Sequence, residues 1–171
     1  YLVSTDFSDI YFTSTTTPDT VPWADATHIF SAPSGGSACD PSILKYGNSG
    51  GTDDLIVFHA PGYSDESQPL EYIYSTDAGA TWNASSIAFT DAAHGTQVSW
   101  DMMPRAYLKD STTILVLASM EQRGVSRGQG DIVMIEFPVS AIGNAHYTAI
   151  QDGIDNAAAG VAVEATGQLK V

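Results

Sequence analysis

Cysteine, basic side chains and long apolar runs are all scarce in this sequence, and each scarcity excludes something. The one cysteine, Cys39, excludes an intrachain disulfide and a zinc site made of several thiolates. Six Lys and Arg residues against 20 Asp and Glu residues give a formal net charge of -14, which repels nucleic-acid phosphates and anionic lipids. No apolar run approaches the roughly 18 residues that a membrane-spanning helix needs. We therefore expect a soluble, acidic protein that binds neither nucleic acid nor membrane.

What the sequence does contain fits one folded domain outside the cell. Its 171 residues are typical of a single domain, and a hydrophobic content of 43% is enough for a packed core. Few basic residues, abundant Ser, Thr, Asp and Gly, and a glycosylation sequon at residues 83–85 favour a secreted protein. The chain starts with Tyr1, and no basic segment followed by an apolar one comes after it. We therefore expect a mature form or a part of a longer protein.

Short apolar segments recur at an interval of about 60 residues, which is the main sign of organisation along the chain. Period-2 alternation and β-branched or aromatic runs dominate these segments, whereas helical periodicity is scarce. The first family comprises residues 40–47 and 101–108; the second, residues 55–60 and 115–119; the third, residues 9–14, 71–75 and 131–135; and a weaker fourth, residues 28–30, 87–89 and 147–150. Four short strands in each period predict an all-β fold made of four-stranded β-propeller blades. A β-sandwich with accidental spacing is the alternative.

The predicted blades make up a single domain, a partial β-propeller over residues 1–171. Its blade parts are residues 1–36, 37–97, 98–155 and 156–171. Together they amount to about three blades, whereas propellers close with four to eight. Two explanations stay open. The chain is a part of a longer propeller, or two copies form a homodimer that closes one six-bladed ring.

The two chain ends are predicted to share one blade. Residues 168–171 fall where a second-family strand begins, and residues 1–4 look like the rest of such a strand. The C-terminus would then carry the inner half of a blade and the N-terminus the outer half. Residues 156–165 are rich in alanine and start with an N-cap type residue, so a short helix is the alternative there.

Residues 75–82 carry the most specific pattern in the chain, Ser-x-Asp-x-Gly-x-Thr-Trp. Its fixed positions are Ser75, Asp77, Gly79, Thr81 and Trp82. The aspartate is suited to accept hydrogen bonds from the amides of a tight turn, and the glycine to supply a positive φ. The threonine can return its hydroxyl to the loop, and the tryptophan ring can pack between strands. This segment resembles the Asp-box of sialidases and other Asp-box (BNR-repeat) propellers, and the resemblance implies a structural turn on the outer rim of a propeller.

A second resemblance concerns the first strands of the predicted blades. Residues 40–47 followed by residues 55–59 are similar to blades of arabinanase-type and sialidase-type glycosidases, and residues 103–121 resemble the corresponding stretch of a six-bladed exo-glycosidase. The resemblance implies that the innermost strands line a central funnel and present carboxylates to a sugar.

Glycoside cleavage generally uses two carboxyl groups about 5–10 Å apart, one protonated and one ionised. The best-placed acids for catalysis are Asp40 and Asp101, at equivalent positions of the first-strand family, with Glu121 at the end of a second-family strand. The alternative is that the two aspartates only cap strand starts and accept hydrogen bonds from turn amides.

Three further residues are candidates for substrate binding. The planar guanidinium of Arg105 could hold a carboxylate or a sugar hydroxyl, and Trp100 could stack on a sugar ring. His59 ends an apolar strand, where a hydrogen-bonded rim residue is the alternative; for Trp100 the alternative is core packing. No residue spacing indicates a metal site or a cofactor, so we expect neither.

The function predicted from these patterns is glycan recognition. We expect a propeller that binds a glycan or oligosaccharide, as part of a sialidase-like or arabinanase-like glycoside hydrolase. The alternative is a non-catalytic propeller module that binds carbohydrate or protein, since a fold does not determine a function.

Overall fold

The computed structural model describes residues 1–6, 8–17, 20, 23–32, 39–60, 70–89, 104–121, 130–143 and 169–170. In these ranges the chain is all-β, with two three-residue 3-10 helices and no helix that could cross a membrane. The strands are β1 (Leu2–Thr5), β2 (Asp9–Thr13), β3 (Thr27–Ser31), β4 (Cys39–Ser49), β5 (Thr52–Ala60), β6 (Leu70–Ser75), β7 (Ser86–Phe89), β8 (Arg105–Asp110), β9 (Thr113–Glu121), β10 (Gly130–Pro138) and β11 (Leu169–Lys170); the 3-10 helices are η1 (Trp23–Asp25) and η2 (Val139–Ala141).

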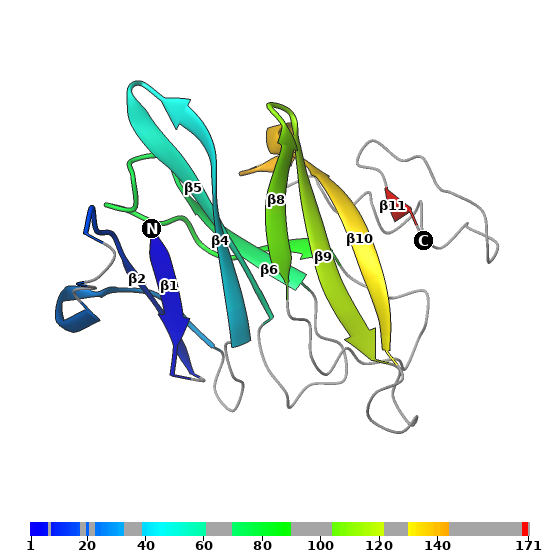
Figure 1. Ribbon diagram of the computed structural model, residues 1–171, viewed down its shortest axis with the longest axis horizontal. Helices are drawn as coiled ribbons and strands as arrows, with labels where there is room; N and C mark the ends of the chain where they lie inside the picture. Colours follow the sequence, from blue (N-terminus) through cyan, green and yellow to red (C-terminus); the bar gives the residue numbers. More distant parts are fainter. Residues whose placement is uncertain are drawn as a thin grey trace.

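The strands form three antiparallel sheets that lie side by side along the longest axis (Figure 1). Sheet 1 has the order β1-β2-β3, sheet 2 the order β4-β5-β6-β7, and sheet 3 the order β11-β10-β9-β8. Within each sheet, each strand pairs with the strand that follows it in sequence. Short turns join β4 to β5 and β8 to β9, as antiparallel pairing allows. The predicted all-β class is confirmed, and strands β2 to β7, β9 and β10 lie at the segments where strands were predicted. Of the strand predicted at residues 101–108, β8 confirms the part from Arg105, and residues 101–103 lie outside the described residues.

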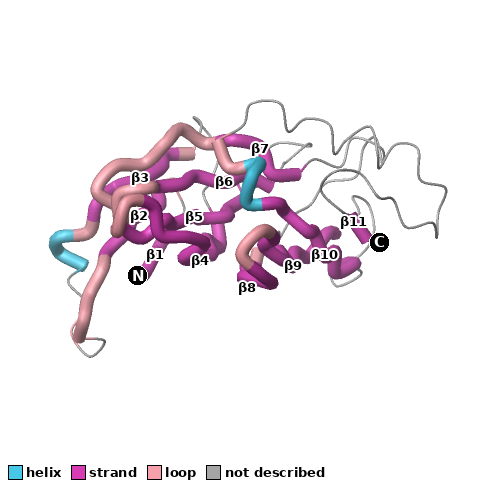
Figure 2. Tube along the Cα trace, turned by 90° about the horizontal axis from the view of Figure 1, so that it is seen from above, coloured by secondary structure: helices cyan, strands magenta, loops and turns pink. Residues whose placement is uncertain are grey.

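The leading strands of the three sheets are close together. Strand β4 contacts β1 on one side and β8 on the other. In Figure 2, β1, β4 and β8 lie along one side of the molecule, while β3 and β7 lie along the opposite side. A hydrogen bond from the Ala106 N–H to Ser42 Oγ (3.2 Å) joins β8 directly to β4. The sheets therefore meet along their leading strands.

The core lies between sheets 2 and 3. Apolar side chains of both sheets and of η2 form one buried cluster: Ile56, Phe58, Ala60, Leu70, Tyr72, Ala88, Ile114, Val116, Ile135, Phe137 and Ala141. The opposite face of sheet 2 packs against sheet 1, where the rings of Phe30 and His59 are 4.2 Å apart. Sheet 2 is therefore the middle layer of the described structure, covered on both faces.

The repeat interval does not preserve the faces of the strands. Spacing by 60 residues aligns Leu55 of β5 with Leu115 of β9. In β5, Ile56 and Phe58 face sheet 3, so Leu55 lies on the opposite face, toward sheet 1. In β9, Ile114 and Val116 face sheet 2, so Leu115 lies on the face directed away from sheet 2. Because residues 55–58 of β5 are all apolar, this part of its sequence has no alternation to establish which face each residue takes, and a shift of one residue reverses the faces.

The prediction for the C-terminal strand is wrong. Residues 168–171 were expected to form a second-family strand within a blade shared with residues 1–4. Instead, β11 pairs with β10 through Met134↔Lys170 and Ile135↔Leu169, so it is the outer strand of sheet 3. A two-residue strand has too few side chains for its sequence to specify which strand it pairs with. It pairs with β10 because the edge of β10 opposite β9 is available for hydrogen bonding. The predicted strand at residues 147–150 and the alternative helix at residues 156–165 lie outside the described residues.

Candidate functional site

Asp40 stands at the start of β4 in an unusual backbone conformation. Its φ is 46°, in the left-handed region that few residues other than glycine adopt, although aspartate tolerates it better than most. The pairing of β4 with β5 is irregular between Cys39 and Ser42, as in a β-bulge. Bulges occur often beside functional sites, where they redirect a side chain. The left-handed φ and the irregular pairing therefore interrupt the regular strand geometry at Asp40.

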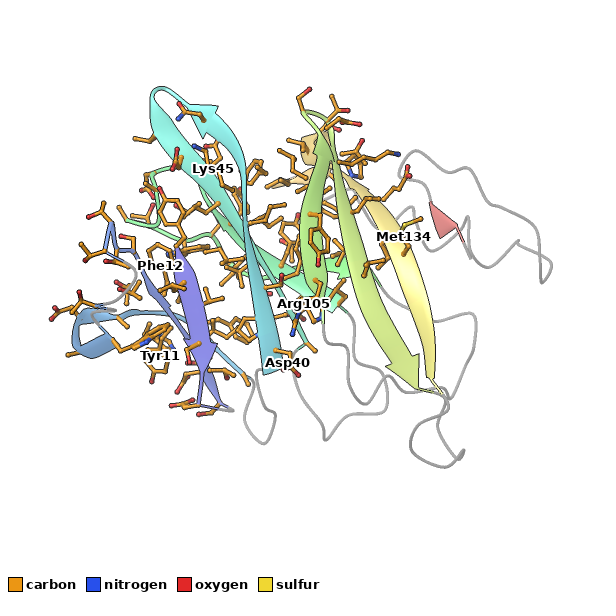
Figure 3. The ribbon with its side chains drawn as sticks, in the orientation of Figure 1. Tyr11, Phe12, Asp40, Lys45, Arg105 and Met134 are labelled. Atoms are coloured by element: carbon orange, nitrogen blue, oxygen red, sulfur yellow. The ribbon has the colours of Figure 1, made fainter. Side chains whose placement is uncertain are left out.

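Arg105 is the first residue of β8. Its side chain is exposed, and its Nη1 donates a hydrogen bond to the carbonyl oxygen of Pro104 (2.8 Å). Figure 3 shows Arg105 and Asp40 near each other at the lower ends of their strands. The bond between Ser42 and Ala106 holds these two strand starts side by side. The structure thus brings together one predicted acid and the predicted cation.

Glu121 lies toward the same end of sheet 3. It is the last residue of β9 and pairs with Gly130. Because β9 runs antiparallel to β8 and Arg105 pairs with Leu117, the chain of β9 continues past Arg105 to reach Glu121. The other two predictions for this end, Asp101 and Trp100, lie outside the described residues.

His59 is fully buried between sheets 1 and 2. Its Nε2 is 3.2 Å from Ser85 Oγ, and Ser85 Oγ donates to Glu71 Oε2 (2.7 Å). Burial lowers the pKa of His59 to about 3, so the ring is neutral over the physiological range. In this buried position the ring has no access to solvent, which favours the hydrogen-bonded role over substrate contact.

Glu71 and Ser85 complete this buried group, and the sequence patterns did not single them out. Burial raises the pKa of Glu71, and the hydrogen bond from Ser85 partly offsets that rise. In the part of the chain that the structure describes, Nδ1 of His59 is buried without a hydrogen-bond partner. The sequence alone does not show that these residues meet, because His59 and Glu71 become neighbours only through the register of β5 with β6.

The turn between β6 and β7 is built by the side chains of the Asp-box pattern. Ser75 Oγ donates to Asp77 Oδ1 (2.7 Å) and accepts from the Gly79 N–H (2.9 Å). Asp77 accepts two further bonds from Thr81, one from its N–H (2.8 Å) and one from its hydroxyl (2.6 Å). These bonds, with the Thr81 hydroxyl first, lower the pKa of Asp77 to about 2. The carboxylate is occupied by its own turn and has a structural role.

Gly79 and Trp82 attach this turn to sheet 1. Gly79 has a φ of 90°, and a Cβ at this position would collide with the ring of Phe12 in β2. Trp82 donates from Nε1 to the Gly79 carbonyl (3.1 Å) and meets Phe12 edge-on at 5.2 Å between ring centroids. The turn therefore holds sheets 1 and 2 together, and it contributes nothing to the strand ends where Asp40 and Arg105 lie.

Within the described ranges, no three His, Cys, Asp or Glu side chains are grouped so that they could hold a metal ion. Comparisons of this chain with protein-family models, with curated proteins and with solved structures find no match.

Proposed function

We propose that the chain recognises glycans at the end of the sheets where β4 and β8 begin, and that its sheets are blades of an Asp-box type β-propeller. The observation that carries the proposal is the bulge at Asp40, whose left-handed backbone directs a carboxylate from the leading strand of sheet 2. A non-glycine residue in this conformation costs free energy, and such residues occur in tight turns and also cluster at functional sites. Arg105 lies beside it on the neighbouring leading strand.

The two groups have the chemistry that sugar recognition needs. A carboxylate accepts hydrogen bonds from paired sugar hydroxyls, and a guanidinium donates several bonds in a fixed plane. Hydrolysis needs a second carboxyl across the scissile bond, and we assign that role to Asp101 or Glu121. The propeller arrangement is supported by the meeting of the leading strands and by the hydrogen-bonded turn at Ser75 to Thr81.

A panel of fluorogenic glycosides and a glycan array test this proposal together. The wild-type chain is expected to bind or cleave at least one glycan, and Asp40→Asn and Arg105→Met are each expected to reduce that signal more than tenfold, about 1.4 kcal/mol or more. Asp40→Asn removes the charge and keeps a residue that tolerates the left-handed backbone.

Two matched controls change the same kinds of charge elsewhere. Asp25→Asn alters an exposed carboxylate in η1, and Lys45→Met removes an exposed cation from β4 that pairs with Asp53. Both should leave glycan binding unchanged. Binding without turnover would identify a non-catalytic module, and the absence of both signals from the wild type would refute the proposal.

A further inference from the structure

Sheet 3 presents a face that differs from every other sheet face in the described structure. We define the outer face of sheet 3 as the side chains that alternate with its core residues: Tyr107, Lys109, Leu115, Leu117, Met134 and Glu136. Tyr107 is 55% exposed, the largest exposure among the exposed large hydrophobic side chains of the described residues. Leu115, Leu117 and Met134 are half-buried. This face combines an exposed aromatic ring on the edge strand β8 with half-buried aliphatic side chains on β9 and β10. Aromatic residues and methionine are enriched in protein interfaces.

Its position is equivalent to a face that is already covered elsewhere in the molecule. Sheet 1 packs on one face of sheet 2, and sheet 3 packs on the other. Each sheet therefore packs face to face on the next sheet along the chain: sheet 1 on sheet 2, and sheet 2 on sheet 3. The outer face of sheet 3 is where a further sheet would continue this series.

The opposite end of the series is the outer face of sheet 1, which we define as Asp9, Tyr11, His28 and Ser31. Their contacts place them together: His28 Nε2 is 3.1 Å from Asp9 Oδ1, Ser31 donates to the same oxygen (2.6 Å), and the rings of Tyr11 and His28 meet edge-on. Asp6 adjoins them through the Tyr11 hydroxyl. Tyr11 and Met134 lie toward opposite ends of the longest axis (Figure 3).

The two outer faces are also complementary in charge. Three of the six basic residues of this acidic chain belong to sheet 3: Arg105, Lys109 and Lys170. Lys109 on the outer face forms an ion pair with Glu136 (2.7 Å) at its margin. The outer face of sheet 1 carries the carboxylate of Asp9, with that of Asp6 beside it. A basic and apolar face at one end and an acidic face at the other favour head-to-tail contact between identical chains.

We propose that the outer face of sheet 3 binds the outer face of sheet 1 of a second copy of this chain, and that two such contacts close a symmetric dimer. Tyr107 is the aromatic anchor of each contact, and Lys109 faces the Asp9 carboxylate of the other copy. The test of this inference is separate from the test of the proposed glycan site, because its variants change neither Asp40 nor Arg105.

A charge-swap experiment tests this dimer by sedimentation equilibrium. The wild-type chain is expected at twice 18.1 kDa. Lys109→Glu and Asp9→Lys are each expected to weaken self-association at least about tenfold, because each variant opposes like charges across both contacts. An equimolar mixture of the two variants should recover the dimer, since one reversed face meets the other.

Further variants separate the proposed contact from other causes. Tyr107→Ser should also weaken the dimer about tenfold while circular dichroism stays unchanged, because the ring is exposed in the single chain. Thr76→Glu and Ala80→Lys change the charge in the same two directions, by one unit each, on exposed residues at the Asp-box turn and should have no effect. A wild type that stays at 18.1 kDa, an assembly larger than two chains, or a variant mixture that fails to recover overturns the proposal.

Discussion

Strands β5 and β9 have similar apolar sequences, yet sheets 2 and 3 bury them differently. In β5 every residue from Asp54 to Ala60 is buried. In β9 the burial alternates: Ile114, Val116 and Ala118 are buried, whereas Leu115 and Leu117 are only half-buried. The difference follows from the layers, because sheet 2 has a sheet on each face and the outer face of sheet 3 is exposed. An apolar run thus shows only that both faces of a strand could be buried. The tertiary structure decides whether both faces are in fact buried.

Matched leucine truncations in the two strands are the most direct way to break this comparison. Leu55→Ala is expected to lower the free energy of unfolding by about 3–4 kcal/mol, because it opens a cavity between sheets 1 and 2. Leu115→Ala should cost only about 1–2 kcal/mol, since its side chain is half-buried. Urea denaturation at low protein concentration, where association is negligible, measures both. Equal losses would contradict the two-layer burial of β5.

The contact between sheets 1 and 2 can be tested at two glycines with nearly the same backbone. Gly79 and Gly51 have φ values of 90° and 91°, but a Cβ meets Phe12 at Gly79 and open space at Gly51. Gly51→Ala should therefore cost about 1 kcal/mol from backbone strain alone. Gly79→Ala should cost about 2–3 kcal/mol, since the Phe12 ring must also move. Thermal unfolding of both variants gives the comparison, and a larger loss at Gly51 would refute the close packing at the Asp-box turn.

The buried His59 predicts an acid sensitivity located between sheets 1 and 2. Folding excludes the proton, because burial holds the folded-state pKa at about 3 against an ordinary value of 6.5. Its contribution to stability is therefore complete above pH 6.5 and is lost toward pH 3, at up to about 1.4 kcal/mol per pH unit. Glu71, the acid on the adjacent strand, has a raised pKa and acts in the opposite direction, since its protonation favours the folded state.

The variant His59→Gln isolates this effect. Glutamine keeps a donor for Ser85 and does not titrate, so the slope of stability against pH between 6.5 and 5 should flatten relative to wild type. Denaturant titrations at several pH values measure the slope in both proteins. A variant slope as steep as the wild-type slope would show that His59 is not the responsible group.

The smallest expected effect on the free energy of unfolding is at Asp40, at the start of the leading strand of sheet 2. Asp40→Asn should change the free energy of unfolding by less than about 0.5 kcal/mol, because asparagine also tolerates a φ of 46°. Asp40→Ala should cost about 1 kcal/mol, since alanine lacks that tolerance. Urea denaturation distinguishes the two substitutions. A large loss in Asp40→Asn would mean that the carboxylate stabilises the bulge, and it would weaken the case for a binding role.

Much of the candidate site depended on information that local sequence does not hold. The Asp-box turn was accessible from residues 75–82 because its hydrogen bonds join residues four apart or closer. The proximity of Arg105 to Asp40 followed only loosely from the repeat, and the bulge at Asp40 was not foreseen. His59 was singled out, but its partners Ser85 and Glu71 were missed. Ser85 is 26 residues from His59 in sequence, and only the pairing of β5 with β6 brings Glu71 opposite it.

Alternating and β-branched residues, together with the turn chemistry of one octapeptide, determined that this chain forms short antiparallel strands and where most of them lie. Those properties are local, so neighbouring residues suffice to specify them. The tertiary structure decided which strand faces are covered, in what phase β9 sits on the core, and that β11 joins the edge of β10. Such choices depend on the free energy of burying whole faces against one another, and no single segment contains that information.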